Sequence, residues 1–402
     1  MNRREFLKAS LAAAGALAFS RFVEGKDITK PEYPGGPVYL PVVINRGGGG
    51  SKFGKVVHVH SAAATNWDFN ASTYYGRTQI TGVRGVNQAV VDEMVDRGLT
   101  ELVGLPPSQI SQAWEQIIPD YTPGKLVAIK INLNNSTSCS SMTTSIDAIA
   151  QPVNAVVRGL TLRGVREPDI VVFDAIRRFP ERLDQELLYH SIQFFDSAGC
   201  QGNFTSFSSN DPNSRVVFSP PSGSVGIVRL ADILINASYL INMPIMKGHS
   251  LAGVTLGFKN HFGSTNNPSG MHNFVSTSYP QINIYNALVD LNSNPHIAAK
   301  TVLVIGDGIY GSRGHMASPP ARWSTFGNQA PCSLFFARDP VAIDCVMHDL
   351  LKAEKGDGLP STSHYYLVLA GAAGLGIYEA GDPWSNPYGS GYSRIAYSRI
   401  EI

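Results

Sequence analysis

The stretch Asn242-Met-Pro-Ile-Met-Lys-Gly-His-Ser-Leu-Ala-Gly-Val-Thr-Leu-Gly-Phe-Lys-Asn-His-Phe-Gly263 organises this chain of 402 residues. It continues an apolar run, Ile233 to Ile245, that predicts a buried strand. Polar side chains with catalytic or binding potential then follow within fifteen residues: Lys247, His249, Lys259, Asn260 and His261. Because α/β proteins usually bind ligands just beyond the ends of their core strands, the stretch predicts a functional site.

The rest of the chain alternates between apolar strand-like runs and segments with helical periodicity. Strands are predicted at 55–61, 126–131, 169–174, 301–305, 334–337 and 394–400. Helices are predicted at 83–98, 108–118, 144–160, 182–197, 282–291, 340–351 and 364–373. This alternation predicts an α/β fold with a largely parallel or mixed central sheet and helices on both faces.

The N-terminus resembles a twin-arginine export signal. Arg3 and Arg4 precede Phe-Leu-Lys, and an apolar run of about eleven residues follows, Ala9 to Phe19, which is too short to span a bilayer. We therefore expect residues 1–25 to be a signal peptide, with the twin-arginine export machinery as a partner. The resemblance implies a periplasmic or other extracytoplasmic protein that crosses the membrane already folded.

Composition and charge restrict the domain organisation, the partners and the cofactors that we expect. Residues 26–54 are rich in Pro and Gly and read as a linker, which leaves residues 55–402 as a single α/β domain. The net charge is +1, so nothing recruits nucleic acid, and the domain contains no apolar segment suited to cross a membrane. The four cysteines form no Cys-x-x-Cys pair, so an iron–sulfur cluster is not expected, and sequence alone does not pair them.

Other polar residues lie near the ends of predicted strands. Lys130 lies inside an apolar strand, where an unpaired charge is costly, and Asn132 follows it. Asp307 lies in a glycine-rich segment, predicted to be a mobile loop that also presents Arg313 and His315. Asp344 falls in the predicted helix 340–351, which Asp339 and Pro340 begin. Segment 264–281 is long for a connector and reads as a lid over the site.

The central stretch also resembles the signature of the bacterial and archaeal family called domain of unknown function 362. The matching residues are Pro244, Lys247, His249, Val254-Thr255, Lys259-Asn260 and Gly263, together with the pieces 127–132 and 339–344. Some members of this family carry ferredoxin-type cysteine runs, which this sequence lacks. The resemblance implies a fold and a residue map, and it favours a functional role for Asp344.

These residues allow three interpretations. The first is an exported enzyme that acts on a small anionic substrate, with His249, Lys247, Lys259 and Asp344 as catalytic residues. Substrate would be bound by Lys130, Asn132, Asn260, His261 and Asp307. The second is a periplasmic binding or assembly protein that uses the same basic pocket without turnover. In the third, Lys247 and Lys259 pair structurally with Asp307 and Asp344.

A divalent metal is an open possibility in the first interpretation, since Asp307 and Asp344 with a histidine offer suitable ligand types. His58 and His60 in the first strand are a weaker candidate pair, and a half-exposed strand face explains their spacing as well. The sequence identifies neither a metal nor a substrate.

Overall fold

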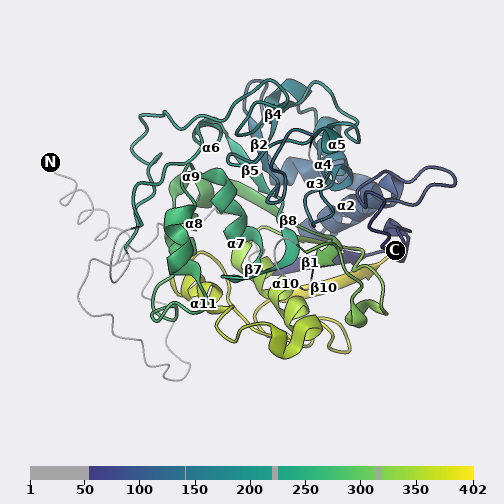
Figure 1. The fold of residues 1–402 in the computed structure, drawn as a ribbon. Helices are drawn as coiled ribbons and strands as arrows, with labels where there is room; N and C mark the ends of the chain where they lie inside the picture. Colours follow the sequence, from purple (N-terminus) through teal and green to yellow (C-terminus); the bar gives the residue numbers. More distant parts are fainter. Residues whose placement is uncertain (1–53, 141, 220–224, 313, 315–317) are drawn as a thin grey trace. The chain divides into compact units, whose positions relative to one another are not determined.

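A computed structural model describes residues 54–140, 142–219, 225–312, 314 and 318–402 (Figure 1). The predicted signal peptide, all of the predicted linker except Gly54, and both Arg313 and His315 lie outside these ranges. The described residues belong to one compact unit of the chain. None of their helices is both long enough and apolar enough to cross a membrane.

A mixed sheet of ten strands forms the centre of the fold. Its main path runs in the order β10-β1-β9-β8-β5-β2-β3-β4, and β6 pairs with both β7 and β8. The strand pairs β1–β9, β8–β9 and β6–β7 are antiparallel, and the other pairs are parallel. The strands are β1 (Lys55–His60), β2 (Val127–Lys130), β3 (Ile170–Phe173), β4 (Gln193–Phe195), β5 (Tyr239–Asn242), β6 (Ile245–His249), β7 (Gly253–Thr255), β8 (Thr301–Ser312), β9 (Ser333–Ala337) and β10 (Ala396–Glu401).

Helices cover both faces of this sheet, which confirms the predicted fold class (Figure 1). One face packs against α2 (Gln88–Val103), α3 (Ile110–Ile117) and α4 (Ala150–Leu162). The other packs against α7 (Gly257–Asn260), α8 (Ala287–Asn292), α10 (Pro340–Lys355) and α11 (Tyr365–Ala372). The alternation of strand side chains explains the two cores: in β1, Val57 and Val59 enter the first core and Val56 enters the second.

The smaller elements connect these layers. They are the short helices α5 (Glu181–Asp184), α6 (Asp232–Asn236) and α9 (Pro295–Ala298) and the 3₁₀ turns Ala62–Ala64, Pro107–Gln109, Glu167–Asp169, His261–Ser264, Ser269–Val275, Ser324–Phe326 and Gly356–Gly358. Asp339 begins α10 as predicted, because its carboxylate accepts the backbone N–H groups of Val341 and Ala342.

Three element predictions are wrong. The helix predicted at 182–197 is only the short α5, and the segment ends in the edge strand β4, from which Phe194 enters the core next to the buried Ile192. The apolar run 233–245 is divided into α6, β5 and the start of β6. The predicted glycine loop after Ile305 is a continuation of β8, because Gly306 and Gly308 let the strand pass tightly against Phe335.

The predicted end of the first helix, at Gly98, is also wrong for a packing reason. Helix α2 continues to Val103 and ends at Gly104, whose φ of 74° suits glycine. Gly98 lies inside the helix, where a Cβ atom would overlap the ring of Phe336 on β9. The glycine therefore sets how closely α2 approaches the sheet.

We expect Gly98→Ala to destabilise the protein even though alanine is the better helix former. The propensity gain is at most about 1 kcal/mol, whereas overpacking a core contact costs about 1–3 kcal/mol. Urea denaturation should show a net loss in unfolding free energy. Gly358→Ala is the matched control, because no atom lies within 4 Å of its added Cβ. Equal stability of the two variants would contradict this role for Gly98.

Candidate functional site

The central stretch folds into a hairpin and a helical turn next to the C-terminal ends of the parallel strands. Strands β6 and β7 pair with Lys247 opposite Thr255, and α7 follows directly. Asp344 on α10 holds the start of α7: its carboxylate accepts the N–H groups of Gly257 at 2.7 Å and Phe258 at 3.0 Å. The hydroxyl of Tyr366 donates a third hydrogen bond at 3.1 Å. Asp344 is therefore engaged in positioning the turn that carries Lys259.

The side-chain amide of Asn260 connects three chain segments behind this turn. Its Nδ2 donates to Asn242 Oδ1 at 2.8 Å and to the carbonyl of Lys130 at 3.3 Å. Its Oδ1 accepts from Asn132 Nδ2 at 3.1 Å and from Lys130 Nζ at 3.4 Å. With both N–H groups and both lone pairs used, the buried amide has one fixed orientation. Asn260 thereby fixes α7 to the ends of β2 and β5.

Lys130 is neutralised by an internal partner. Its ammonium lies 3.1 Å from the Asp174 carboxylate, and it also donates to the carbonyl of Ile131. Burial lowers the pKa of Lys130, while Asp174 opposes that shift. Because both side chains are almost completely buried, the pair serves the architecture of the site, and Lys130 has little charge to offer a ligand.

Lys247 is buried beside the same network. Its ammonium donates to Asn132 Oδ1 at 3.0 Å and to the carbonyl of Ile146 at 3.5 Å. Burial lowers its pKa to about 8, against the opposing influence of Asp147 and Asp174. Asp147 already accepts a 3.0 Å ion pair from Arg182. Within the described ranges, Lys247 thus has hydrogen-bond partners but no ion pair with a carboxylate.

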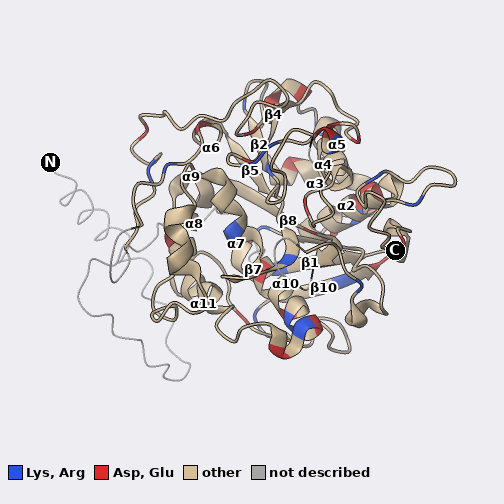
Figure 2. Ribbon diagram, in the orientation of Figure 1, with Lys and Arg blue, Asp and Glu red and all other residues tan. Residues whose placement is uncertain are grey.

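Lys259 differs from the other two lysines. Among the described residues it has no hydrogen bond or ion pair, and its Nζ lies 3.7 Å from the ring centroid of Phe262. Burial, together with the positive charges of Lys247 and Arg177, lowers its pKa to about 7. Figure 2 shows basic positions on α7 and near β7 in the middle of the fold. The residue as a whole keeps 7% of its surface exposed, whereas Lys130 and Lys247 keep none.

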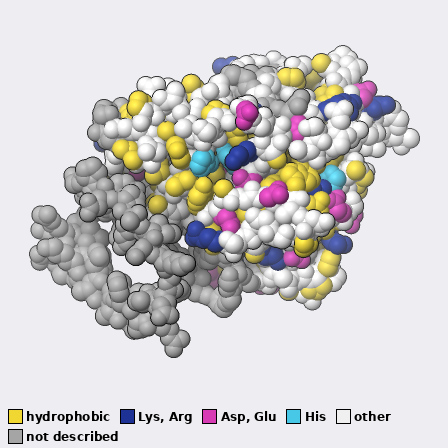
Figure 3. Space-filling model, turned by 90° about the horizontal axis from the view of Figure 1, so that it is seen from below, with side chains coloured by type: hydrophobic (Ala, Val, Ile, Leu, Met, Phe, Trp, Pro, Cys, Tyr) yellow, Lys and Arg dark blue, Asp and Glu magenta, His cyan; other side chains and the backbone are white. Residues whose placement is uncertain are grey.

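Two histidines lie near this lysine. His249 accepts the N–H groups of Leu251 and Ala252 on Nδ1, at 3.1 and 3.2 Å, so its proton resides on Nε2. The ring of His272 lies 6.4 Å from that of His249 and edge-on to Phe262 at 5.2 Å. Figure 3 shows histidine side chains next to Lys or Arg side chains on the surface. His272, in the segment predicted to be a lid, therefore belongs with the site.

Arg177 supplies a further cation. Its Nη2 donates to Asn134 Oδ1 at 3.3 Å, and its buried Nε has no hydrogen-bond partner among the described residues. Arg177 follows Asp174, which comes directly after β3, so the sequence alone predicts that both residues lie near a strand end. Its proximity to Lys259, by contrast, depends on the tertiary fold.

A disulfide braces the rim of the site. Cys139 and Cys200 are joined, while Cys332 and Cys345 are free and buried. The bond ties the loop after β2 to the segment after β4, and Arg178 adds backbone contacts between Ser136 and the loop after β3. The loop that carries Asn132 and Asn134 is therefore tied covalently to the segment after β4, and hydrogen bonds connect it to the loop that carries Arg177.

The remaining predicted site residues lie apart from the lysines or are fully engaged. His261 is buried and its Nδ1 pairs with Ser264 Oγ at 3.1 Å; burial lowers its pKa to about 3, so it is neutral. Asp307 accepts the N–H of Ile309 at 3.0 Å, and burial raises its pKa to about 7. No ion pair within the described ranges joins Asp307 or Asp344 to Lys247 or Lys259, which leaves the third interpretation without its pairs.

The described residues provide no set of ligands for the divalent metal that the sequence left open. In the part of the chain that the structure describes, no three His, Cys, Asp or Glu side chains gather in a way that could hold an ion. His58 is buried in the sheet between Tyr397 and Ser333, each 2.8 Å away, which is the behaviour of a satisfied core histidine.

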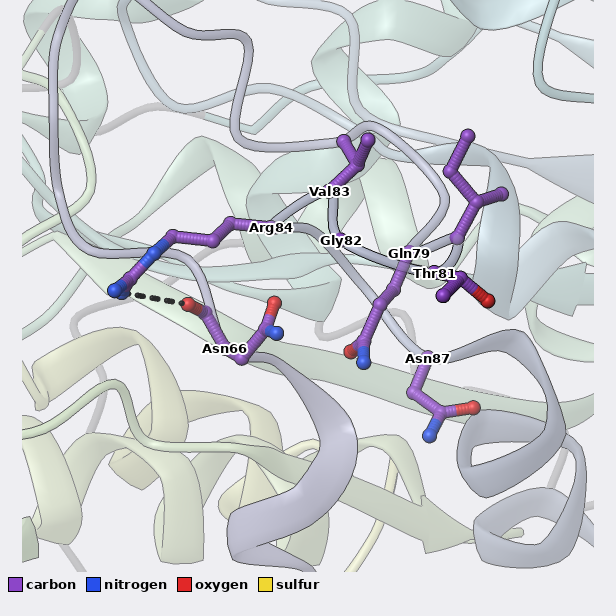
Figure 4. A pocket seen from close by; sticks show the side chains of 8 residues that line it. Asn66, Gln79, Thr81, Gly82, Val83, Arg84 and Asn87 are labelled. Atoms are coloured by element: carbon purple, nitrogen blue, oxygen red, sulfur yellow. Dashed lines mark hydrogen bonds between the residues drawn. The ribbon is translucent and has the colours of Figure 1, made fainter.

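A groove lies away from the lysine cluster. It has a volume of about 730 Å³ under the loop from Gln79 to Asn87 and is lined by amides, aliphatic groups and Arg84 (Figure 4). Arg84 spans it with a 3.4 Å hydrogen bond to the carbonyl of Asn66. It contains neither histidine nor carboxylate, so we assign the chemistry to the lysine cluster instead.

A mixed α/β sheet with buried lysines and asparagines beyond its parallel strand ends defines the class of this protein. Residues 127–349 match the family model described as Domain of unknown function (DUF362), and the chain belongs to that family. The match includes every residue of the cluster, from Lys130 to Asp344.

Other comparisons add little. A search of curated proteins found no match. One matching solved structure is a crystal structure of a Thermotoga maritima protein from the Northeast Structural Genomics Consortium, 13% identical, with a TM-score of 0.27. The match covers 54% of each chain, so this chain spans about half the length of that neighbour.

We expect Lys259→Met to stabilise the protein in a pH-dependent way. Folding lowers this pKa from its usual 10.5 to about 7, so the folded state binds fewer protons between these values. The native lysine therefore penalises folding fully below pH 7, and the penalty fades as pH rises toward 10.5. Urea denaturation should show the variant more stable by at least about 1 kcal/mol at pH 6, since one pKa unit is worth about 1.4 kcal/mol. The gain should vanish near pH 10.

The control is Lys352→Met, which removes an exposed lysine on α10. It should change stability little at either pH, because an exposed ammonium keeps its hydration in the folded state. A Lys259→Met variant that is less stable than the native protein at pH 6 would show that its ammonium is well paired.

Proposed function

We propose that this member of the family is an exported enzyme that binds a small anionic substrate at Lys247, Lys259 and Arg177. The observation that carries the proposal is the buried amine of Lys259, which lies near two other cations and has no acidic partner among the described residues. Buried charges are normally paired, so an excess of buried positive charge indicates a site that an anion completes.

The same environment makes Lys259 suitable for proton transfer. A general acid or base works best when its pKa lies near the working pH, and burial brings this lysine to about 7. The ring of His272 lies 6.4 Å from that of His249 and packs edge-on against Phe262, and the half-exposed His272 can exchange protons with solvent. Lys247 and Arg177 would hold the anionic group. Asp344, Asn260 and Asn132 position these groups, and the Lys130–Asp174 pair supports them.

A binding protein without catalysis is the second candidate. The observation in its favour is that several conspicuous polar groups are committed to structural hydrogen bonds, including Asp344 and Nδ1 of His249. A pure binding site needs only the cations, whereas an acid–base mechanism needs Lys259 to titrate near neutral pH. Turnover that follows a Lys259-dependent pH profile separates the two.

Export is supported by two independent features. The first is the paired Arg3 and Arg4 ahead of a short apolar run. The second is the Cys139–Cys200 disulfide, because structural disulfides persist mainly in oxidising compartments. A twin-arginine route would deliver the domain already folded, so the Cys139–Cys200 disulfide would form after the site is largely complete.

Anion binding is expected to depend on Lys259. Titration calorimetry of the mature protein with inorganic phosphate, succinate and pyruvate should detect binding of at least one anion. Lys259→Gln should weaken it at least tenfold, or by about 1.4 kcal/mol, because a charge-assisted contact is lost. Lys352→Gln, which removes the same charge from the surface, should bind within twofold of the native protein. Equal weakening by both substitutions would point to non-specific charge effects and contradict the proposal.

Export is expected to need both arginines. In a bacterial host with a twin-arginine system, the native chain should appear in the periplasmic fraction with Cys139 and Cys200 protected from thiol alkylation. The double variant Arg3→Lys, Arg4→Lys should remain in the cytoplasm. Arg21→Lys serves as the control, because it conserves charge outside the paired arginines. A native chain found only in the cytoplasm would refute the export proposal.

A further inference from the structure

The last strand of the central sheet has an edge that is not used inside the chain. Strand β10 is the outermost strand at its end of the main path, and among the described residues it pairs only with β1 (Figure 1). The N–H groups of Ala396 and Ile402 donate to carbonyl groups at the two ends of β1, at 2.9 and 3.0 Å. Because backbone groups alternate in direction along a strand, those of Arg399 and Glu401 point to the open side, where they have no partner in the described ranges. Such an edge can pair with a further strand.

A loop restricts the open edge to the second half of β10. Gly389 lies so close to the carbonyl oxygen of Tyr397 that a Cβ atom added to it would overlap that oxygen. Tyr388, in the same loop, holds the guanidinium of Arg399 against its ring, with 4.9 Å between the guanidinium carbon and the ring centroid. Beyond this loop, each of the residues 398–402 keeps part of its surface exposed. A partner strand is therefore confined to this short segment.

The open segment carries one positive and one negative side chain on the same face. Arg399 and Glu401 are two residues apart on the strand, and Nε of the arginine lies 2.6 Å from the glutamate carboxylate. The arginine side chain is only 6% exposed, whereas that of the glutamate is 54% exposed. Nη1 of Arg399 has no hydrogen-bond partner within the part of the chain that the structure describes. The edge thus presents a fixed cation and a free carboxylate on either side of Ile400.

This charge pattern is complementary to itself. When two copies of β10 run antiparallel about a two-fold axis at Ile400, Arg399 of each copy lies opposite Glu401 of the other copy. The outward N–H and C=O groups of these two residues then exchange main-chain hydrogen bonds, and Ile400 meets its counterpart in a non-hydrogen-bonded pair. A two-fold axis at Arg399 or Glu401 would instead place like charges opposite each other, which destabilises a strand pair. The charges therefore select one register.

We propose that the protein binds a second copy of itself through β10, as a two-fold symmetric dimer in which the two central sheets continue into one. The inference goes beyond the proposed function, because this surface contributes no residue to the lysine cluster. Charge complementarity identifies the partner, since the segment that fits the open edge is the same segment of another copy. Tyr388 beside the edge is 46% exposed, so each copy also brings apolar area to the interface.

Sedimentation velocity and light scattering on the mature protein test this inference. We expect a reversible dimer whose fraction grows with protein concentration. Glu401→Arg places an arginine opposite Arg399 at two symmetric positions, so the dissociation constant should rise at least tenfold. Glu93→Arg makes the same charge reversal at an exposed position of α2 and should dimerise like the native protein. The comparison separates a local effect at β10 from the change in net charge.

Oxidative cross-linking locates the two-fold axis. Ile400→Cys puts a thiol at the centre of the strand pair, where the two Cα atoms would be about 4.5 Å apart and a disulfide can form. Copper phenanthroline should therefore convert this variant into a covalent dimer. Ser398→Cys is the matched control, since its two copies would lie about 14 Å apart along the strands, beyond the reach of a disulfide. The native chain serves as the blank, because Cys139 and Cys200 are already joined and the other two cysteines are buried.

Each outcome decides for or against the β10 dimer. A protein that stays monomeric at every concentration tested would overturn it. A dimer that tolerates Glu401→Arg and forms no cross-link through Ile400→Cys would overturn it as well, because another surface would then be in use. A cross-link through Ser398→Cys alone would contradict the register. Circular dichroism verifies folding, and the cross-link through Ile400→Cys decides where Glu401→Arg fails to fold. Anion binding at the lysine cluster is measured separately, so the dimer and the proposed function can fail independently.

Discussion

Everything in the site depends on the side-chain amide of Asn260. It joins the ends of β2 and β5 to the helical turn that follows the β6–β7 hairpin, using all of its hydrogen-bonding capacity. An aspartate in this position would lose both donors, and a leucine would leave several buried polar groups without partners. Because the amide orients Asn132, it also sets the acceptor used by Lys247. The geometry of two lysines therefore follows from one neutral residue.

The three lysines show how burial divides similar residues among different tasks. Lys130 has a carboxylate, Lys247 has amide and carbonyl oxygens, and Lys259 has an aromatic ring. Burial lowers the pKa of all three lysines, to about 8 for Lys247 and to about 7 for Lys259, while the Asp174 carboxylate opposes the shift at Lys130. The lysine with the weakest support, Lys259, is also the least completely buried of the three.

Sequence patterns predicted which of these residues lie together better than they predicted the contacts that each residue makes. The pattern of apolar runs predicted the α/β class and brought Lys130, Lys247, Lys259 and Asn260 to one edge of the sheet, because strand ends converge there in such folds. It could not separate a paired lysine from an unpaired one, since the partners Asp174 and Asn132 come from other strands. Asp344 looked catalytic only by resemblance, and its contacts with α7 arise from packing between helices.

The misassigned elements have a common origin. Gly98, Gly306 and Gly308 read as helix ends or loops because glycine has low intrinsic propensity for regular structure. In the fold they permit close packing against Phe336, Phe335 and Met347, which no local pattern encodes. His272 was not predicted as a site residue for a related reason. It lies outside the central stretch, and it comes beside Phe262 only because the 3₁₀ turn Ser269–Val275 folds back.

The site penalises folding at neutral pH, and this suggests why its rim is so strongly braced. Burial raises the pKa of Asp307 to about 7, so its contribution to stability declines as pH rises from about 4 to 7. Burial lowers the pKa of Lys259 to about 7, so its penalty is relieved only above that pH. Both penalties are therefore substantial near pH 7.

The Cys139–Cys200 bond offsets such a loss because it closes a loop of 61 residues, which in a chain-entropy model is worth about 4 kcal/mol. An anion bound at Lys259 would stabilise the folded state further, since a ligand that binds only the native form shifts the folding equilibrium toward it.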